Sequence, residues 1–393
     1  MAPSWRGRAA DGRGRRKGAA STALMHASGG CAGGVSRATL GRMSTSAVAA
    51  PHPVRWGIIA PGIIAHRQVA DMRRHGLRVD AVASCELARA QAFAAEFSLA
   101  RAYGDYAQLC ADPEIDAVYI ASPHPFHAEQ ALQAIAHGKH VLVEKAFAMS
   151  AAQAQTVFDA AAARGVIALE AMWVRYLPYM RVIEDWLAEG HIGRVRAMSA
   201  DRSTVLSTDP THRVRAIELG GGALLDVGVY AISFVQAVLG APVAIAARGR
   251  LTEQGVDAAA AAVLEYAGGA LATVTTSIDT VGTNAVTIMG ERGRIEVLPN
   301  AYEWPFDVRL LDAEGTQLGA FTASHEGCGM HFQALELESL VAAGRTRSEV
   351  MSPDDTMDVL RIIDEIRRQI GVRYPSDDAN EDLADERGRR RRG

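Results

Sequence analysis

The sequence predicts an α/β protein with an N-terminal doubly wound parallel sheet, followed by an α+β domain with a large, mostly antiparallel open sheet. With 393 residues the chain is longer than one hydrophobic core usually supports, so two domains are expected. From Val54 to about Leu169, short apolar runs alternate with amphipathic stretches, which is typical of repeated βαβ units. From about Arg194, strand-like runs follow each other through turn signals without intervening helices, which favours antiparallel pairing.

The first half of the sequence predicts a parallel sheet of buried strands that are separated by helices. Its strands are short apolar runs, and the segments between them carry apolar residues at helical spacing. The expected strands are Trp56 to Ile59, Val79 to Ala83, Ala117 to Ala121 and His140 to Val143, and the helices include Leu87 to Phe97 and Ala128 to His137.

The second half of the sequence predicts a series of strands that are joined by turns such as Gly268-Gly269. An amphipathic helix, about Pro353 to Ile370, follows them and is expected to pack back on the body of the protein. The expected strands are Val195 to Ala200, Ala258 to Tyr266, Ala270 to Ile278, Ala285 to Met289, Arg294 to Val297 and Val308 to Leu311.

Four segments are expected along the chain: residues 1–52, 53–170, 171–375 and 376–393. Residues 1–42 carry eight Lys or Arg against one acid, with Gly, Ser and Ala between them, and such a stretch cannot build a core. We interpret this stretch as a disordered leader. Alternatively, the start codon has been assigned too far upstream and translation begins at Met43. The Arg15-Arg16 pair suggests an export signal, but no adequate apolar region follows it. The last segment, acids followed by Arg389 to Arg392, is expected to be solvated.

Composition excludes several classes of function. Hydrophobic residues make up 49% and charged residues 22%, and a net charge of -4 offers no basic field for nucleic acid. We find no apolar run long enough to span a bilayer. The four cysteines form no C-x-x-C pair, and His124 and His127, three apart, have no further ligands at metal-like spacing. These features predict a cytoplasmic protein that acts on small molecules and has no metal site.

The first expected strand runs into Gly57 to Ala65, where a dinucleotide-binding fold needs a tight turn and a helix start. Read as G-x-G-x-x-G/A, the triplet is Ala60-x-Gly62-x-x-Ala65, so the first glycine is replaced, and Pro61 removes one backbone donor. Gly62 is the main candidate for contact with a pyrophosphate at the helix N-terminus. The alternative is an ordinary strand-to-helix turn in a domain that binds no nucleotide.

The end of the second strand bears on the choice between NAD and NADP. Ser84 stands where an acidic residue would hold the ribose of NAD, and it cannot repel a 2′-phosphate as Asp would. Arg89 could reach that phosphate from the first helical turn, although Glu86 opposes it and an exposed Arg is often only a solvated charge. The sequence therefore predicts NADP or NAD, with NADP preferred.

Four motifs occur further along in the order and spacing of a known family. They are Ser122 to His127, Glu144-Lys145-Ala146, Glu170 to Tyr176 and Gly220 to Tyr230. Together they resemble the glucose–fructose oxidoreductase/inositol dehydrogenase (Gfo/Idh/MocA) family, particularly its dimeric dihydrodiol dehydrogenase and NADP-dependent sugar 1-dehydrogenase branch. The resemblance covers about Val54 to Pro375. It implies a Rossmann NAD(P)-binding domain over residues 53–170 and a substrate and dimerisation domain over residues 171–375.

The resemblance implies a catalytic group of Lys145, Asp226 and Tyr230. Lys145 takes the place of the family's E-K-P lysine, with Ala146 in place of Pro, and a lysine beside a hydroxyl can stabilise an alkoxide-like transition state. Asp226 and Tyr230 are four apart, so a helix would put both on one face. Tyr230 is the implied acid/base, and we expect the Lys145 cation to lower its pKa. The alternatives are an exposed lysine at a strand end and a tyrosine of the core.

Further contacts follow from the same resemblance. Trp173, Arg175 and Tyr176 are expected to line the substrate pocket, with core packing as the alternative for the two aromatic residues. His127 is either a contact of substrate or nicotinamide ribose or a structural cap, and His331 is expected to reach the cleft. The remaining expected cofactor contacts are Gly57, Ala60, Ile63, Ile64, Ser122, His124 and Glu144.

The expected function is NAD(P)-linked removal of hydride from a secondary alcohol or lactol of a small sugar, polyol or trans-dihydrodiol. A redox-neutral enzyme that retains NAD, such as a glycosidase or epimerase, and a non-catalytic NAD(P)-binding sensor are the alternatives. A homodimer or higher homo-oligomer is expected through the open face of the C-terminal sheet. The strand Ala270 to Ile278 alternates two sets of residues, so one side can pack on helices while the milder side can meet a partner. The two sets are Leu271, Thr273, Thr275 and Ser277, and Ala272, Val274, Thr276 and Ile278.

Overall fold

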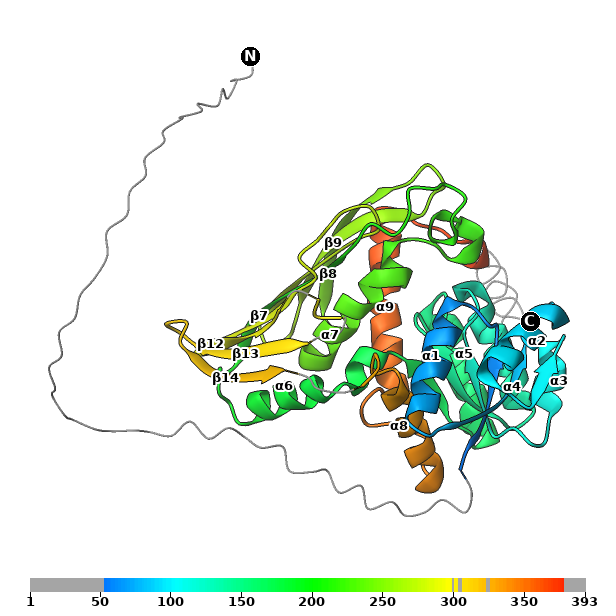
Figure 1. Cartoon of the computed structure of the whole chain (residues 1–393). Coiled ribbons are helices and arrows are strands. Elements are labelled where there is room, and N and C mark those ends of the chain that lie inside the picture. Colours follow the sequence, from blue (N-terminus) through cyan, green and yellow to red (C-terminus); the bar gives the residue numbers. More distant parts are fainter. Residues whose placement is uncertain (1–52, 299, 303–305, 323–325, 378–393) are drawn as a thin grey trace, which may run out of the picture. The chain divides into compact units, whose positions relative to one another are not determined.

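A computed structural model describes residues 53–298, 300–302, 306–322 and 326–377 of the chain (Figure 1), all of which belong to one compact unit. The expected leader, residues 1–52, lies outside the described residues, as does the expected tail after Asp377. The start of that tail is held in place, because the Asp377 carboxylate accepts a hydrogen bond from Arg367 at 2.5 Å and from the Tyr374 amide at 2.8 Å.

The first half forms a six-stranded sheet in which every pair of neighbours is parallel, with the order β3-β2-β1-β4-β5-β6. Nearly every residue of β1, β2, β4, β5 and β6 is buried, as expected of a sheet covered by helices on both faces. The strands are β1 (Arg55–Ile59), β2 (Arg78–Ala83), β3 (Arg101–Tyr103), β4 (Ala117–Ile120), β5 (His140–Glu144) and β6 (Ala168–Ala171). The helices are α1 (Ile63–Arg74), α2 (Leu87–Phe97), α3 (Tyr106–Ala111), α4 (His127–Ala136) and α5 (Ala151–Arg164).

The second half forms an eight-stranded sheet with the order β14-β13-β12-β11-β7-β10-β9-β8. Only the β7–β10 pair is parallel, so the sheet is mostly antiparallel. Its strands are β7 (Val195–Ser203), β8 (Ala244–Leu251), β9 (Asp257–Glu265), β10 (Leu271–Ser277), β11 (Val286–Gly290), β12 (Gly293–Val297), β13 (Asp307–Asp312) and β14 (Gln317–Thr322). The helices are α6 (Pro178–Ala188), α7 (Val229–Leu239), α8 (His331–Ala342) and α9 (Pro353–Ile370).

Helix α9 lies between the two sheets (Figure 1), and it contacts α5 and β6 of the first half as well as α7 and β8 of the second. Its start is fixed by a capping box, because the Ser352 side chain accepts from the Asp355 amide while the Asp355 carboxylate accepts from the Ser352 amide. It ends at Gly371, whose φ of 83° is left-handed and favours glycine. The predicted bounds of this helix are confirmed, and the two caps are the physical reason that it begins and ends there.

The open face of the eight-stranded sheet is made by alternate residues of its strands. On β10 the side chains of Leu271, Thr273 and Thr275 are exposed, while Ala272 and Val274 are buried beneath α7. This alternation was predicted for the strand, except that Ser277, expected on the open side, is buried.

Helix α7 is preceded by a π-helical turn, Leu224–Gly228, in which hydrogen bonds span one residue more than in an α-helix. The stretch Ile217–Leu239 around it is long and apolar enough to cross a membrane by composition, with a mean hydropathy of 1.7. Within that stretch 78% of the most apolar window is buried inside the protein, which is the pattern of a core helix.

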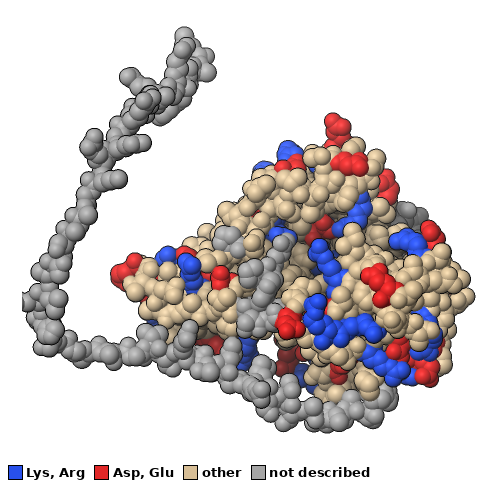
Figure 2. All heavy atoms as spheres, viewed as in Figure 1, with Lys and Arg blue, Asp and Glu red and all other residues tan. Residues whose placement is uncertain are grey.

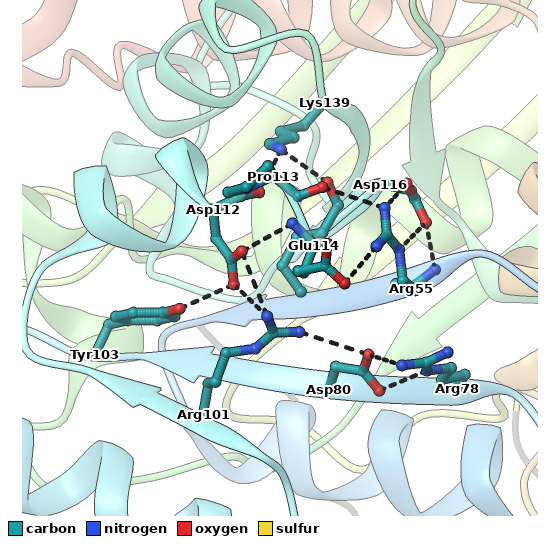
Figure 3. A network of polar contacts seen from close by, with 11 residues as sticks. Arg55, Arg78, Asp80, Arg101, Tyr103, Asp112, Pro113, Glu114, Asp116 and Lys139 are labelled. Carbon is teal, nitrogen blue, oxygen red and sulfur yellow. Dashed lines mark hydrogen bonds and ion pairs between the residues drawn. The ribbon is translucent and has the colours of Figure 1, made fainter.

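The amino-terminal edge of the parallel sheet is closed by charged side chains (Figure 3). Arg55 at the start of β1 binds Asp116 through Nε at 2.9 Å and Nη2 at 2.8 Å. Arg101 at the start of β3 pairs with Asp112 at 3.1 Å and with Asp80 at 3.6 Å. The charged side chains at this edge therefore pair with one another within the fold.

Over the face that Figure 2 shows, basic and acidic side chains lie interspersed.

Candidate active site

The carboxyl ends of four neighbouring strands, β2, β1, β4 and β5, carry most of the residues that the sequence singled out. The chain order reverses between β1 and β4, which makes this the switch point of a doubly wound sheet. Gly62 follows β1, Ser84 follows β2, Ser122 follows β4 and Lys145 follows β5. Parallel pairing brings all four strand ends to one edge of the sheet.

The turn after β1 has the conformation that a nucleotide-binding turn requires. Ala60 takes a φ of 66°, in the left-handed region that favours glycine, which explains why the fingerprint usually has glycine there. Its carbonyl accepts from the Gly62 amide at 2.8 Å. Gly62 is the N-cap of α1 with φ at -87°, so its backbone does not need glycine, and a β-carbon built there meets no atom within 4 Å. Space for a ligand therefore opens beside Gly62 at the N-terminus of α1.

The other predicted cofactor residues divide into exposed and buried ones. Ile63 is 80% exposed and Ile64 half-buried beside the turn, whereas Gly57 lies inside β1, where a β-carbon would approach Leu109 to 2.9 Å. Gly57 therefore serves close packing of the strand rather than the turn. At the end of β2, Ser84 is buried with its hydroxyl accepting from the Glu86 amide at 3.3 Å. Arg89 is exposed on the first turn of α2.

Lys145 and Asp226 meet across the two halves of the chain. The Lys145 ammonium donates to the Asp226 carbonyl at 2.5 Å and lies 3.7 Å from the Asp226 carboxylate and 5.0 Å from the centre of the Tyr230 ring. Burial acts to lower the pKa of Lys145, but the electrostatic influence of Tyr230, Asp226 and Glu144 outweighs it, and the pKa is raised. Lys145 is therefore held as a cation. The peptide bond between Lys145 and Ala146 is cis.

Arg213 is a second cation at Asp226 that the sequence analysis missed. Its guanidinium donates to Asp226 Oδ1 at 3.0 Å, and its side chain is 47% exposed on a turn before the Gly220 to Gly222 run. Burial alone would raise the pKa of Asp226, but Lys145, Arg213 and His124 together hold it well below its usual range. Asp226 is therefore an ionised carboxylate shared by two cations. No spacing or motif marked Arg213, because the contact depends on how its loop folds back.

Tyr230 lies next to this group at the start of α7, four residues after Asp226 as predicted. Its hydroxyl accepts a hydrogen bond from Trp173 Nε1 at 3.3 Å. Burial raises the pKa of Tyr230 above its usual value, although Lys145 acts to lower it. Lys145 therefore acts in the expected direction, but the desolvation of the phenolate is the larger effect, so the pKa of Tyr230 is raised.

Two histidines and Glu144 hold the loops of this site. His124 is buried, with Nδ1 2.9 Å from the Gly220 carbonyl, and burial lowers its pKa to about 3. His127 is fully buried, with Nδ1 2.9 Å from the Ala146 carbonyl and Nε2 2.7 Å from the Ser122 carbonyl. Of the two roles left open for His127, these contacts favour the structural one. Glu144 is buried and accepts from the Tyr119 hydroxyl, and the Ser122 hydroxyl donates to Gln130 at 2.7 Å.

Three predicted pocket residues point elsewhere. Arg175 is buried and donates to the Ser233 carbonyl and the Gln236 side chain, both at 3.0 Å, so it ties α7 to the segment after β6. Tyr176 lies against the Glu170 carbonyl at 3.5 Å. His331 binds Asp71 at 3.0 Å near the C-terminal end of α1, at the opposite end of that helix from Gly62. Of the predicted pocket residues, Trp173 is the one that contacts Tyr230.

A buried carboxylate supports the turn that carries Asp226. Asp257 is fully buried at the start of β9, and its Oδ2 accepts from the Leu224 amide at 2.7 Å. Gly222, with a φ of 116°, leaves space for this carboxylate, because a β-carbon there would fall 2.1 Å from Asp257 Oδ1. Sequence reasoning missed this residue, since a single Asp in an alanine-rich strand carries no motif.

Comparison with known proteins shows which family the chain belongs to. Residues 54–172 match the model of an oxidoreductase family with an NAD-binding Rossmann fold, and residues 180–296 match the GFO/IDH/MocA C-terminal domain. Trans-1,2-dihydrobenzene-1,2-diol dehydrogenase of Danio rerio is 37% identical to the chain, covering 82% of it and 99% of that enzyme. The Bos taurus enzyme of the same name is 31% identical over the same shares. The chain belongs to the Gfo/Idh/MocA oxidoreductase family.

Solved structures place the chain in the same fold. A 3-ketoreductase from Actinomadura kijaniata, in complex with NADP and TDP-benzene, is 26% identical, with a TM-score of 0.73 over 81% of this chain and 98% of that one. A levoglucosan dehydrogenase in complex with NADH and levoglucosan, 22% identical, gives a TM-score of 0.70 over 81% and 98%. This Gfo/Idh/MocA protein therefore has the family's NAD(P)-binding Rossmann domain, and α1 begins at Gly62, where an added β-carbon would meet no atom within 4 Å.

Proposed function

We propose that this protein is an NAD(P)-dependent dehydrogenase that oxidises a secondary alcohol or lactol of a trans-dihydrodiol, small sugar or polyol. Membership of an oxidoreductase family and the identity with dihydrodiol dehydrogenases support the reaction class. The observation that carries the proposal is the cluster of Lys145, Asp226 and Tyr230 beside the carboxyl ends of β4 and β5. It combines a fixed cation, a carboxylate and a phenol where ligands of such sheets bind.

The residues of this cluster have separate chemical roles in the proposal. A bound nicotinamide would supply the hydride acceptor. Tyr230 receives the proton of the substrate hydroxyl at its phenolic oxygen, and Lys145 stabilises the negative charge that develops on the substrate oxygen. Asp226 holds Lys145 in place through its backbone carbonyl and carboxylate and orients the substrate. Trp173 offers an aromatic wall to an apolar ring face and holds the Tyr230 hydroxyl.

The raised pKa of Tyr230 decides the direction that the site favours at neutral pH. A neutral phenol can donate a proton, as reduction of a ketone requires, whereas oxidation needs the phenolate. Because burial raises the pKa of Tyr230, the oxidation rate should rise as the pH rises above neutrality. The same site therefore serves oxidation best in alkaline solution and reduction best near neutrality.

The experiment is a screen of the purified protein with NAD and with NADP against trans-dihydrodiols, aldoses and inositols. The readout is the near-ultraviolet absorbance of reduced nicotinamide. Steady formation of reduced cofactor with at least one substrate class is expected. A protein that purifies with bound nicotinamide, converts substrate and shows no net absorbance change would instead be a redox-neutral enzyme on this fold. A protein that binds nucleotide and converts nothing would be a sensor.

We further propose a preference for NADP over NAD. Ser84 puts a hydroxyl rather than a carboxylate at the end of β2, and Arg89 is exposed on the first turn of α2, the helix that follows that strand, with Glu86 as the opposing charge. Arg89→Ala should weaken NADP binding by about 10–100-fold, the worth of a hydrogen bond to a charged group, and leave NAD binding unchanged. Arg67→Ala, at an exposed arginine of α1, is the matched control. Equal losses for both nucleotides would contradict the assignment.

A homodimer formed through the open face of the eight-stranded sheet is also proposed. Val263 on β9 is 38% exposed and Leu271 on β10 is 49% exposed on this face, among Ala and Thr side chains. Light scattering should give twice the mass of one chain for the wild type. Leu271→Lys should shift it towards one chain, while Leu335→Lys, at a 39% exposed position of α8, should not. A wild-type monomer at micromolar concentration would contradict the proposal.

We also propose the division into a cofactor domain over residues 53–170 and a substrate domain over residues 171–375, and a location in the cytoplasm. The two sheets, which share no strand, support the division. The free thiols of Cys85, Cys110 and Cys328 support a reducing compartment. Limited proteolysis tests the domains, and fractionation of cells tests the location.

A further inference from the structure

Glu170 is a buried carboxylate to which the proposed mechanism gives no role. It lies on β6 beside β5, the strand that ends at Glu144 just before Lys145, and it is 1% exposed. The Phe147 amide donates to its Oε1 at 3.2 Å, and the Thr356 hydroxyl donates to its Oε2 at 2.9 Å. Each carboxylate oxygen is therefore occupied by a donor from a different part of the chain.

The bond from Phe147 fixes a peptide group close to Lys145. The Phe147 amide and the Ala146 carbonyl belong to one planar peptide unit. That carbonyl lies 2.9 Å from His127 Nδ1, so side chains contact this peptide unit at both of its polar ends. Because Ala146, unlike a proline, leaves its own φ free, the direction in which the chain carries Lys145 out of β5 depends on such contacts.

Of the two contacts with this peptide unit, the one with Glu170 is the firmer. Burial lowers the pKa of His127 to about 4, so its imidazole is neutral at neutral pH and has a single N–H. Its two ring nitrogens face two carbonyls, those of Ala146 and Ser122, and one N–H can serve only one of them. A carboxylate can accept with each oxygen, so Glu170 holds both of its donors at once.

Helix α9, which lies between the two sheets (Figure 1), anchors Glu170. Thr356 is 1% exposed near the start of that helix, just after its capping box. Further along α9, the Arg367 guanidinium donates to the Met149 carbonyl at 2.7 Å. The loop after β5 is thus tied to one capped helix at two points, at Phe147 through Glu170 and at Met149 directly.

The hold on Phe147 requires an acceptor rather than a charge. Burial raises the pKa of Glu170 to about 7, although hydrogen bonds from Thr356 and Phe147 act to lower it. In the acid and in the carboxylate form alike, an oxygen of the side chain can accept from an amide. Glutamine, which has a carbonyl oxygen and no charge, should therefore replace Glu170, whereas leucine should not.

We propose that Glu170 is a positioning residue, which sets the direction of Lys145 by holding the Phe147 amide against α9. It acts through the backbone of the loop and not on the substrate or the nucleotide. The proposal rests on the function proposed above for Lys145, and it adds the means by which the fold places that lysine beside Asp226 and Tyr230.

Two substitutions of Glu170 separate the hydrogen bond from the charge. In Glu170→Leu turnover should fall by up to about 10²-fold, the effect of misplacing a catalytic group by about 1 Å, while nucleotide affinity stays as in the wild type. Glu170→Gln should keep most of the turnover. Glu338→Leu is the matched control and should keep wild-type turnover. It removes a half-buried carboxylate that accepts from the Trp56 indole at 2.9 Å, near the amino-terminal end of β1.

A second readout does not depend on activity. The chain has three lysines, Lys17, Lys139 and Lys145, so an amine-reactive reagent such as acetic anhydride has few targets, which mass spectrometry resolves. The Lys145 ammonium is bound to the Asp226 carbonyl and has a raised pKa, so it should react slowly in the wild type. Labelling of Lys145 should be faster in Glu170→Leu. Lys139, 7% exposed before the other end of β5, should react as in the wild type.

The proposal is overturned if Glu170→Leu keeps wild-type turnover or wild-type labelling of Lys145, or if Glu170→Gln loses as much turnover as Glu170→Leu. If circular dichroism shows that Glu170→Leu does not fold, Thr356→Val decides in its place. It removes the hydroxyl that anchors Glu170 and should speed the labelling of Lys145, so unchanged labelling would overturn the proposal. A wild type that is inactive with every substrate would contradict the proposed function alone, because the labelling still tests how Lys145 is held.

Discussion

Replacing Tyr230 by Phe removes one oxygen atom and keeps the ring. The variant therefore distinguishes a catalytic role of the hydroxyl from a packing role of the ring. In the structure that oxygen accepts a single hydrogen bond, from Trp173 Nε1, and the distance of 3.3 Å is long. Losing such a bond costs about 0.5–1.5 kcal/mol, and the ring that packs beside Lys145 remains. The variant should therefore fold, with a melting temperature close to that of the wild type.

Turnover should fall far more than stability. Loss of a general acid or base typically costs about 10²–10⁴-fold, or about 2.7–5.5 kcal/mol of barrier. Cofactor affinity should hardly change, because the nucleotide turn lies at the end of β1. The assay is steady-state oxidation and reduction of the best substrate, with cofactor titration and thermal melts run in parallel.

The pH profile adds a result that a packing role would not give. Burial raises the pKa of Tyr230, so wild-type kcat/KM for oxidation should climb by up to about tenfold per pH unit above neutrality. The Phe variant should lose this slope. Wild-type turnover in the variant, or an unchanged slope, would refute the assignment and leave a bound water as the candidate base, because both ring nitrogens of His127 face carbonyl oxygens.

Three further predictions follow from contacts described above. The double variant Lys145→Met/Tyr230→Phe should be little slower than the slower single variant, because the two groups act as a unit, and kinetics showing fully additive losses would mean separate roles. Gly62→Val should fold, since a β-carbon there meets no atom within 4 Å, yet bind NAD(P) at least about tenfold more weakly; unchanged affinity in a titration would disprove the turn assignment. Burial acts to raise the pKa of Asp71, but hydrogen bonds from His331 lower it to about 2. A lowered carboxylate pKa stabilises the fold above the unfolded value and loses that effect as the pH falls from about 4 towards 2, here about 2 kcal/mol. Acid unfolding should show this loss in the wild type and not in Asp71→Asn.

The strands that the sequence did not reveal share a position in the fold. The strands β3, β6, β8 and β14 were not among those predicted, and each lies at an edge of its sheet. Most residues of β3, β8 and β14 are exposed or half-buried, so no buried run or clean alternation marks them. The strand β6 is buried but only four residues long, and a run this short is a weak signal. The predicted strands are nearly all interior ones, where burial imposes the pattern. Helices α2 and α9 were predicted to the residue, because apolar spacing and, for α9, caps define them.

Within the site, the sequence indicated residues on motifs and missed those that tertiary contacts place there. Lys145, Asp226 and Tyr230 lie on two motifs, and the structure brings them together. Arg213 depends on the path of a loop, so its pairing with Asp226 could not be read from spacing. Arg175 was assigned to the substrate pocket because the family resemblance places the pocket there and an arginine can bind a hydroxyl, but its guanidinium is buried among acceptors of α7. Local patterns show which residues can do chemistry, and burial decides which of them meet a ligand.

The π-helical turn Leu224–Gly228 affects how this region tolerates insertions and deletions. Each residue of a helix turns it by about 100°, so losing Val227 or Gly228 would rotate Asp226 against Tyr230 by about that angle. The following helix, α7, could still form, because its own apolar face would be intact. A one-residue change of length there would therefore leave a folded protein in which the carboxylate no longer faces the phenol. Natural and engineered sequences of this fold should consequently keep a constant length between these two positions even where the residues themselves differ.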